Sequence, residues 1–503
     1  MIASKYAKRD MMQSEFTQRA SHISAHGIGL SVDVYSPDLL HLVQSLRDEE
    51  LKPGYLEIFK ATTFAMQWVR RQFPEIKLAY HGEGLWVTQP DFPQSCSGRQ
   101  GVAEACAQIA ALGSAWLNHE CATKQMAGYA FGTYLPPLYT ELSARATAEN
   151  LAFLQAQLDE QTRCHMDPPS LVLLEMPPLT YFACGSLAIP DFFRAVTDRV
   201  ACGLVLDIGH LWTVYRYTGA WRRQTLEAFA SDFLDAFPME RVIEIHVAGL
   251  AAFATHAESS MDAEPVALPH WIDAHGAPIP EVLFDLLTQV LAHPRLTSLK
   301  GVALEVDTKP VAEIVTEFRR FLERFESKVR CAEQIDHIDL PPYEQSDAFQ
   351  RPHPVSFLAS DEQATLHRQY EGYVELVTTP DRVPMTQELS LLGGSLDDLN
   401  RYREIYLPHE LLHWGGELNE MFPRTGRLMA AADIPLERFA SFWFEKPRPD
   451  QEDYDFFLLK IDRFVEFVAN DCPSACAIVA EEAEELRAAY RAANEPIGAE
   501  VRA

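Results

Sequence analysis

At 503 residues and 47% hydrophobic composition, the chain is long enough to form two packed domains. Its formal net charge of -29 argues against nonspecific binding to nucleic acid or an anionic membrane, because both favour a cationic surface. Nine scattered cysteines favour reduced thiols over a disulfide framework. The sequence has no secretory segment at its start and no apolar run of about 18 residues, so we expect a cytoplasmic protein.

Residues 1–23 are predicted to be a polar lead-in. Apolar runs then recur through the first two thirds of the chain, and helical patterns with apolar residues three and four apart lie between them. Eight strand-helix units within residues 24–328 fit an α/β fold, a closed (β/α)8 barrel of TIM type, better than an open sheet. The predicted strands are 28–32, 55–59, 76–80, 115–117, 171–174, 203–206, 242–245 and 302–304.

Two long insertions interrupt this alternation, at residues 121–140 and 250–280. Both are expected over the active end of the barrel, where long loops without periodicity commonly form lids or binding surfaces. After residue 328 the strand pattern ends. Residues 329–503 are predicted to form a Pro-containing linker and a mostly α-helical C-terminal domain.

Most of the predicted strands lead into residues that can bind a metal ion. The carboxyl ends of barrel strands build one site, so donors that are distant in sequence converge there. Alone, each residue has an ordinary explanation, since buried histidines are usually hydrogen-bonded and strand-end carboxylates often cap helices. Together, so many buried charges would be costly without a cation, and a mixed set of imidazoles and carboxylates suits iron, manganese or zinc. The donors that follow strands are His81, His119, Glu175, Asp207, His210, His246 and Glu305, with Glu57 inside the second strand.

Asp273 and His275 are separated by one residue, so an extended loop can direct both side chains the same way. They lie in the second long insertion and extend the predicted metal site. No phosphate-binding loop, dinucleotide-binding turn or serine-hydrolase elbow is found in the sequence.

Short motifs in a fixed order carry a resemblance to a known family. They are G-x-G-L at 27–30, H-G-x-x-L at 81–85, L-L-E-x-P at 173–177, D-I-G-H at 207–210, E-I-H-x-A-G at 244–249 and D-x-H-G at 273–276, with His119 and Glu305 on the fourth and last strands. In this order they resemble the multinuclear non-haem iron-dependent oxidases, the family that includes the iron enzyme of methanobactin biosynthesis. The resemblance covers about residues 26–325.

The resemblance implies a centre of two or three irons, mixed Fe(II) and Fe(III), with O₂ as co-substrate. Such a centre oxidises a residue, commonly cysteine, of a ribosomally synthesised precursor peptide. Glu175, Asp207 and His210 are assigned to catalysis by this likeness. A partner protein for peptide recognition is also implied, and the C-terminal domain is expected to help recognise the peptide or to replace that partner. The implied metal ligands are His81, His119, Glu175, Asp207, His210, His246, Asp273, His275 and Glu305.

Four residues depart from the family pattern. Asn118 stands where an acidic residue usually precedes the histidine, and Ala61-Thr62 replaces a Glu-Asn pair. His210 occupies a position where many members have asparagine, and we hypothesise that it adds an iron ligand. A different substrate or iron occupancy follows as an expectation.

Two other functions remain open at this point. Sugar isomerases and epimerases that use a divalent metal place Glu, Asp and His at barrel strand ends in the same way, and the D-x-G-H stretch at 207–210 suits them. A binding protein that keeps the barrel but has lost turnover would fit the changes at Asn118 and at Ala61-Thr62. Bound manganese or zinc with sugar turnover would favour the first, and no bound metal the second.

Two further motifs could bind zinc outside the barrel. His409-Glu410-Leu411-Leu412-His413 matches H-E-x-x-H, the metalloprotease helix, but Pro408 and Gly415-Gly416 confine it to a short helix. The alternative is a capped, partly buried helix start. Cys472 and Cys476 lack a second cysteine pair nearby, so reduced thiols are favoured there.

Overall fold

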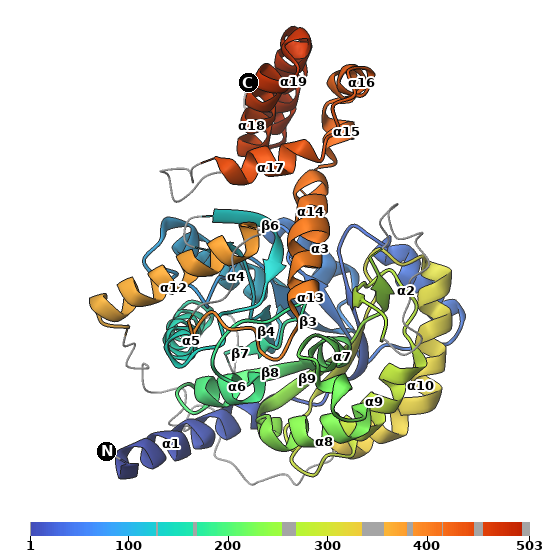
Figure 1. The fold of residues 1–503 in the computed structure, drawn as a ribbon. Coiled ribbons are helices and arrows are strands. Elements are labelled where there is room, and N and C mark those ends of the chain that lie inside the picture. Colours follow the sequence, from blue (N-terminus) through green and yellow to red (C-terminus); the bar gives the residue numbers. More distant parts are fainter. Residues whose placement is uncertain are drawn as a thin grey trace. The chain divides into compact units, whose positions relative to one another are not determined.

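The structure, a computed structural model, describes residues 2–126, 129–163, 169–253, 268–333, 357–379, 386–414, 416–446 and 456–494. Eight parallel strands close into one barrel in which neighbours follow chain order (Figure 1). This confirms the predicted TIM-type barrel, and helices dominate the region after it. The strands are β1 (Gly27–Val32), β2 (Tyr55–Phe59), β3 (Lys77–Gly82), β4 (Trp116–Glu120), β7 (Leu171–Glu175), β8 (Gly203–Asp207), β9 (Val242–Val247) and β12 (Gly301–Glu305).

Helices surround the barrel and alternate with its strands (Figure 1). Several begin at a polar cap: Thr62, Ser95 and Thr140 each accept a hydrogen bond from the backbone N–H three residues on. An extra helix, α7 (Ile208–Tyr217), starts directly after β8 with Asp207 as its N-cap. The other barrel helices are α2 (Leu39–Asp48), α3 (Thr63–Gln72), α4 (Cys96–Leu112), α5 (Glu141–Thr162), α6 (Ile189–Thr197), α8 (Leu226–Ala236), α9 (Glu281–Leu291) and α10 (Val311–Glu333).

Residues 2–21 form helix α1 (Ile2–Ser21), where the sequence analysis expected only a polar lead-in. Met12 and Phe16 are buried in one cluster with Tyr55, Trp116 and other inward residues of the barrel strands. Apolar residues at positions four apart give the helix this one buried face. The mean hydropathy of the segment does not reveal the face, because most of the other residues are polar. The helix therefore completes the core beneath the barrel.

Both long insertions carry a pair of short strands. β5 (Thr123–Met126) pairs with β6 (Tyr129–Leu135), and β10 (Leu250–Ala252) pairs antiparallel with β11 (Trp271–Asp273). Residues 254–267, the middle of the second insertion, lie outside the described residues. The β10–β11 ribbon thus returns the chain to the barrel with Asp273 at its end.

The chain divides into two compact units. The first comprises residues 1–123, 135–373 and 383–399, and the second comprises 124–134, 374–382 and 400–503. Residues 386–399 thus group with the barrel although they follow it by more than fifty residues. The predicted limits of 24–328 and 329–503 stay predictions, and the predicted linker falls largely on residues 334–356, outside the described ranges.

The described part of the second unit is mostly helical and has an aromatic core, with the short strands of residues 124–134 as the exception. The ring of Phe439 lies 5.3 Å from that of Phe464, 5.6 Å from Phe467 and 6.0 Å from Trp443. Among the described residues, no helix is both long and apolar enough to cross a membrane. The helices lying wholly or partly in this unit are α12 (Ser360–Thr378), α13 (Leu396–Arg401), a π-helical turn (Tyr402–Tyr406), α14 (Leu407–His413), α15 (Leu418–Met421), α16 (Pro423–Ala431), α17 (Arg438–Glu445), α18 (Phe456–Asp471) and α19 (Cys476–Asn494).

Candidate metal centre

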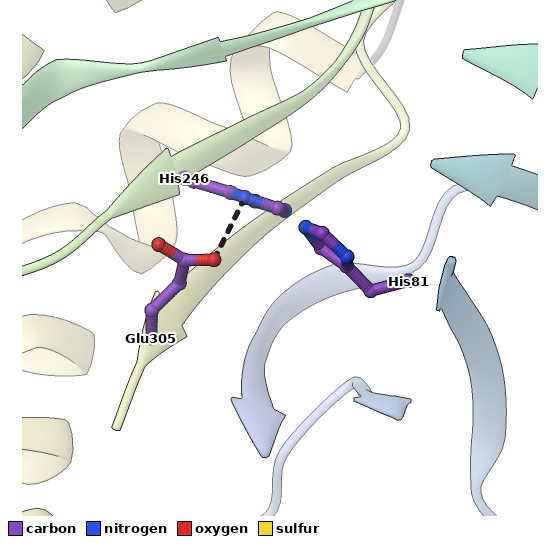
Figure 2. A group of neighbouring side chains, drawn as sticks. All are labelled: His81, His246 and Glu305. Atoms are coloured by element: carbon purple, nitrogen blue, oxygen red, sulfur yellow. Dashed lines mark ion pairs between the residues drawn. The ribbon is translucent and has the colours of Figure 1, made fainter. Parts of the chain in front are cut away.

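His246 on β9 is the central donor of the barrel interior and is completely buried. Its Nδ1 lies 3.3 Å from Glu175 Oε1 and 3.2 Å from Glu305 Oε1. Its Nε2 lies 3.1 Å from Glu57 Oε2 and 3.6 Å from Glu244 Oε2. Figure 2 shows the ring of His246 between His81 and Glu305. His246 therefore joins two groups of donors, one at each ring nitrogen.

His81 and Glu175 form the neighbouring part of the cluster. His81 Nε2 lies 3.3 Å from Glu175 Oε2, and the Asn118 side-chain amide donates a 2.7 Å hydrogen bond to the same oxygen. His81 lies on β3 and Glu175 on β7, and β4, which carries Asn118, lies between these two strands in the barrel. Asn118, where the family usually has an acidic residue, is therefore a donor that holds Glu175 in place.

The junction of β8 and α7 supplies the next two donors. The Asp207 carboxylate accepts a 2.7 Å hydrogen bond from the His210 backbone N–H, which makes it the cap of this helix. His210 Nδ1 donates to the Met176 carbonyl at 2.7 Å, so Nε2 is the ring nitrogen that faces the cluster. This Nε2 lies 3.8 Å from Asp207 Oδ1 and 3.7 Å from Asp273 Oδ2. A ring held in this way is oriented as metal-binding histidines usually are.

The β10–β11 ribbon and the strand β12 complete the cluster. His275 Nε2 lies 3.0 Å from Asp273 Oδ2 and 3.2 Å from Glu305 Oε2. Its Nδ1 lies 2.5 Å from Asp307 Oδ1. Asp307 thus orients the His275 ring from behind.

His119 is the predicted donor that the structure does not pair with these carboxylates. Its Nε2 accepts a 3.0 Å hydrogen bond from the Leu85 backbone N–H. Burial, with the nearby charge of His81, lowers the pKa of His119 to about 3. Alternation along the strand turns the side chains of Asn118 and Glu120 toward the cluster and that of His119 away from it. The assignment of His119 as a metal ligand therefore stays a prediction.

Four carboxylates of the cluster are additional to the nine implied ligands, although the sequence analysis already names Glu57 as a donor inside its strand. Glu57 and Glu244 face His246, and Asp307 faces His275. Glu120 pairs in register with Glu175, and its electrostatic partners are His210, Glu175 and His81. The signal for Glu57 and Glu244 was in the sequence, since an acidic residue inside an apolar strand is rarely tolerated without a partner.

Histidines of the cluster are drawn toward their charged form. Burial alone would lower the pKa of His246, but the charges of Glu57, Glu175 and Glu305 outweigh it and raise that pKa well above its ordinary value. For His81, the hydrogen bond to Glu175 and the charge of Glu57 overcome burial and raise the pKa to about 9. The protonated imidazoles thus supply positive charge to carboxylates that form no ion pair with a lysine or arginine of the described residues.

Several carboxyls are drawn toward their neutral form. Burial raises the pKa of Glu120 to about 8 and that of Asp207 to about 7. Burial, aided by the charge of Glu57, raises the pKa of Glu244 to about 7, and Tyr55 donates a 2.5 Å hydrogen bond to that carboxyl. Protons thus balance part of the negative charge, and a metal ion would displace them.

The donor set fits a metal. Across the described ranges, no lysine or arginine forms an ion pair with the eight carboxylates, which outnumber the four imidazoles among them. Buried atoms that make no hydrogen bond within the described part of the chain include both Glu57 oxygens, Asp207 Oδ2, His210 Nε2 and Glu305 Oε2. Donor atoms lie within 4.8 Å of one another in His81, His246 and Glu305, and again in Glu57, Glu244 and His246. Orphaned oxygens and nitrogens at this spacing suit an ion of iron, manganese or zinc.

Comparison with known proteins identifies the family. The model of the RiPP precursor modification enzymes MbnB/TglH/ChrH, which act on ribosomally synthesised and post-translationally modified peptides, matches residues 41–324, more than half of the chain. The chain belongs to this family. Membership confirms the resemblance of the barrel to the methanobactin-type enzymes. It makes the chain a precursor-modifying enzyme, with a precursor peptide as its class of substrate.

Relatives of this MbnB/TglH/ChrH member cover its barrel. The UPF0276 protein of Caulobacter vibrioides is 26% identical over 281 residues, 54% of this chain and 86% of that protein. The UPF0276 protein of Paraburkholderia phytofirmans is 25% identical over 314 residues, 59% of this chain and 88% of its own. Among solved structures, endonuclease IV of Thermus thermophilus is 15% identical, with a TM-score of 0.35 over 59% of this chain and 99% of that one. The IOLI protein with a bound zinc atom is 11% identical, with a TM-score of 0.37 over 60% and 99%.

The H-E-x-x-H motif lies in the second unit, on the seven-residue helix α14. The rings of His409 and His413 stack with centroids 3.7 Å apart, and His413 Nδ1 bonds to the His409 carbonyl at 2.7 Å. Trp414 has an extended backbone directly after, so the helix ends where the sequence predicted. Groups of three or more close donors occur only in the barrel among the described residues, and Cys472 and Cys476 are free thiols.

Proposed function

We propose that this enzyme is a multinuclear non-haem iron oxidase that uses O₂ to modify a residue, cysteine in our proposal, of a precursor peptide. The observation that carries the proposal is the cluster around His246, where eight carboxylates and four imidazoles meet without a lysine or arginine partner in the described residues. Five of these carboxyls are buried, those of Glu57, Glu175, Asp207, Glu244 and Glu305. Buried carboxylates need protons or cations nearby to balance their charge.

The proposed ligands are the donors assigned from the sequence that meet in the cluster, extended by the carboxylates that the structure adds. His119, whose Nε2 accepts from the Leu85 N–H, stays a prediction outside this set. Glu175 supports a bridging role because its Oε1 faces His246 and its Oε2 faces His81. Glu305 does the same between His246 and His275. Bridging carboxylates hold adjacent ions close, which supports a centre of two or three irons rather than one. Iron of mixed valence would supply one-electron chemistry, O₂ binding and activation of a thiolate.

Residues of the chain prepare this site in three ways. Asp307 and the Met176 carbonyl fix the tautomers of His275 and His210, so that each ring turns Nε2 toward the cluster. Asn118 orients Glu175 by donating to its Oε2. Asp207 has its pKa raised to about 7 by burial, so that it can accept or return a proton near neutral pH when it is not held by a cation. We assign Asp207, His210 and Glu175 to catalysis on these grounds.

The decisive experiment is metal analysis of protein prepared without oxygen. We expect two or three irons per chain, a mixed-valence signal in Mössbauer spectra, and oxidation of a cysteine-containing precursor peptide only when O₂ is supplied. Colourless protein that holds manganese or zinc and converts a sugar without oxygen would refute the oxidase. His210→Ala should lower the iron content without unfolding the chain, and unchanged iron content would remove His210 from the ligands.

We further propose that the second unit contributes to peptide recognition, either alone or with a partner protein. Its described part has a core of its own and carries none of the close donor groups found in the barrel. A test deletion should begin at residue 400, because residues 386–399 group with the barrel. Loss of residues 400–503 should weaken peptide binding more than iron loading, and unaltered peptide affinity would contradict this role.

A further inference from the structure

Residues 386–399, which we name the strap, return to the barrel from far along the chain. The strap forms an antiparallel bridge between Leu391 and Cys184, in the loop after β7. Two backbone hydrogen bonds fix it there, from Leu392 N–H to the Ala183 carbonyl and from Gly185 N–H to the Ser390 carbonyl, both at 2.9 Å. The strap is therefore anchored to the barrel before it reaches Asp398.

Asp398 is a buried carboxylate at the end of the strap, with 3% of its surface exposed. The Ser395 hydroxyl donates to Asp398 Oδ2 at 2.7 Å and accepts from the Asp398 backbone N–H at 3.1 Å, which fixes the side chain at the start of α13. Arg216 Nη1 lies 3.5 Å from Asp398 Oδ2, and His270 Nδ1 lies 3.5 Å from Oδ1. Asp398 thus lies within 3.5 Å of polar side chains from two different elements of the barrel unit.

Arg216 lies on α7, the helix whose first turn carries His210, and is 2% exposed. Its Nε donates to the carbonyls of Leu268 and Pro269, both at 3.3 Å, and its Nη2 is 3.1 Å from His270 Nδ1. These residues lead directly into β11. One guanidinium therefore joins the strap, α7 and the entry to the β10–β11 ribbon.

The ribbon carries this anchoring to the metal centre. Tyr217, next to Arg216, donates a 2.8 Å hydrogen bond to the Trp271 carbonyl at the start of β11. Asp273 stands two residues further on at the end of the same strand, and His275 follows it. Because β11 has only three residues, a shift at its first residue moves Asp273 and His275 with it.

We propose that Asp398 and Arg216 are positioning residues of the metal centre, which set the place of Asp273 and His275 through the ribbon. The inference rests on the proposed metal centre. A buried ion pair contributes little net stability compared with a well-packed apolar pair, but it fixes orientation. The donors of His81, His246 and Glu305 sit on barrel strands, so they do not depend on this pair.

The test compares Asp398→Asn with Asp397→Asn, a change of the neighbouring exposed carboxylate. Anaerobic titration of the full chain with Fe(II), followed by metal counting and ⁵⁷Fe Mössbauer spectra, measures each iron environment. We expect Asp398→Asn and Arg216→Met to weaken one iron site about tenfold, at the lower end of the effect of groups that orient ligands. The remaining sites, and every site in Asp397→Asn, should keep the affinity of the unchanged protein.

A double-mutant comparison separates positioning from general destabilisation. In a chain that already carries Asp273→Asn, the change Asp398→Asn should weaken iron binding less than it does in the unchanged protein, because both act on the same site. Ser395→Ala is a milder variant that keeps both charges, and it serves if Asp398→Asn does not fold. Unchanged iron affinity in these variants, or losses that add fully to those of Asp273→Asn, would overturn the inference. Failure of the unchanged protein to bind two or more irons would instead overturn the proposed function.

Discussion

Metal loading should release several protons near neutral pH, because protons supply the positive charge of the cluster in the metal-free chain. The pKa of His81 is raised to about 9, and those of His210, His246 and His275 are raised well above their ordinary value by the surrounding carboxylates. Each of these imidazoles is therefore charged at pH 7 and must lose a proton before it can bind a metal ion.

The structure sets the size of this effect. Four imidazoles give about four protons per fully loaded chain at pH 7 if all of them bind metal, and Asp207, with a pKa of about 7, adds about half of one. Each released proton makes the free energy of binding more favourable by about 1.4 kcal/mol for each unit that the pH rises. Overall metal binding should therefore strengthen by about 6 kcal/mol between pH 6.5 and 7.5.

Calorimetric titration of the chelated chain with Fe(II) under nitrogen, in two buffers of different ionisation enthalpy, measures the protons released. The stability of the metal-free chain gives an independent check with a definite sign. Because the folded pKa of His81 exceeds the unfolded value, its contribution is complete below about pH 6.5 and is lost as the pH rises through about 9. Release of less than one proton per chain at pH 7, or metal-free stability that rises over this range, would refute the charge balance described for the cluster.

Three further changes test separate parts of the molecule. Glu57→Gln removes the charge 3.1 Å from His246 Nε2, so metal affinity should fall about 10- to 100-fold in titrations while the melting temperature of the chelated chain holds or rises. Phe16→Ala empties the core beneath the barrel and should cost about 3–5 kcal/mol in denaturant unfolding, whereas exposed Met11→Ala should cost almost nothing. Lys460 Nζ donates hydrogen bonds to the carbonyls of Leu412, Trp414 and Gly416, and Lys460→Met removes all three. This change should destabilise the second unit by about 2–4 kcal/mol in urea unfolding without altering the iron content.

The barrel could be predicted from the sequence because each of its strands is a short apolar run between helical patterns. Buried parallel strands need apolar residues on both faces, so the signal is strong even without alternation. Helix α1 was not predicted, because its buried face consists of few residues in a segment rich in Lys, Arg and Gln. Phe16 is buried only through its tertiary contact with the inward side chains at one end of the barrel, which the local sequence does not show.

The candidate site shows a different limit. The fourth strand was predicted to end at Leu117, and His119 was chosen as its donor; in the structure β4 runs on to Glu120. With three more residues in the strand, alternation turns Asn118 and Glu120 inward. The extent of the strand therefore decides which of its side chains are expected to face the cluster, and the assignment of His119 as a ligand stays a prediction.

The strap lay beyond the reach of a sequence pattern for another reason. Asp398 contacts Arg216 across more than 180 residues of chain, and nothing in either local sequence marks the pairing. Its consequence is physical: the ligands on β strands are fixed by the barrel, whereas Asp273 and His275 depend on contacts made by the strap, α7 and the ribbon. Variation in residues 386–399 is therefore expected to alter one part of the metal centre and leave the rest unchanged.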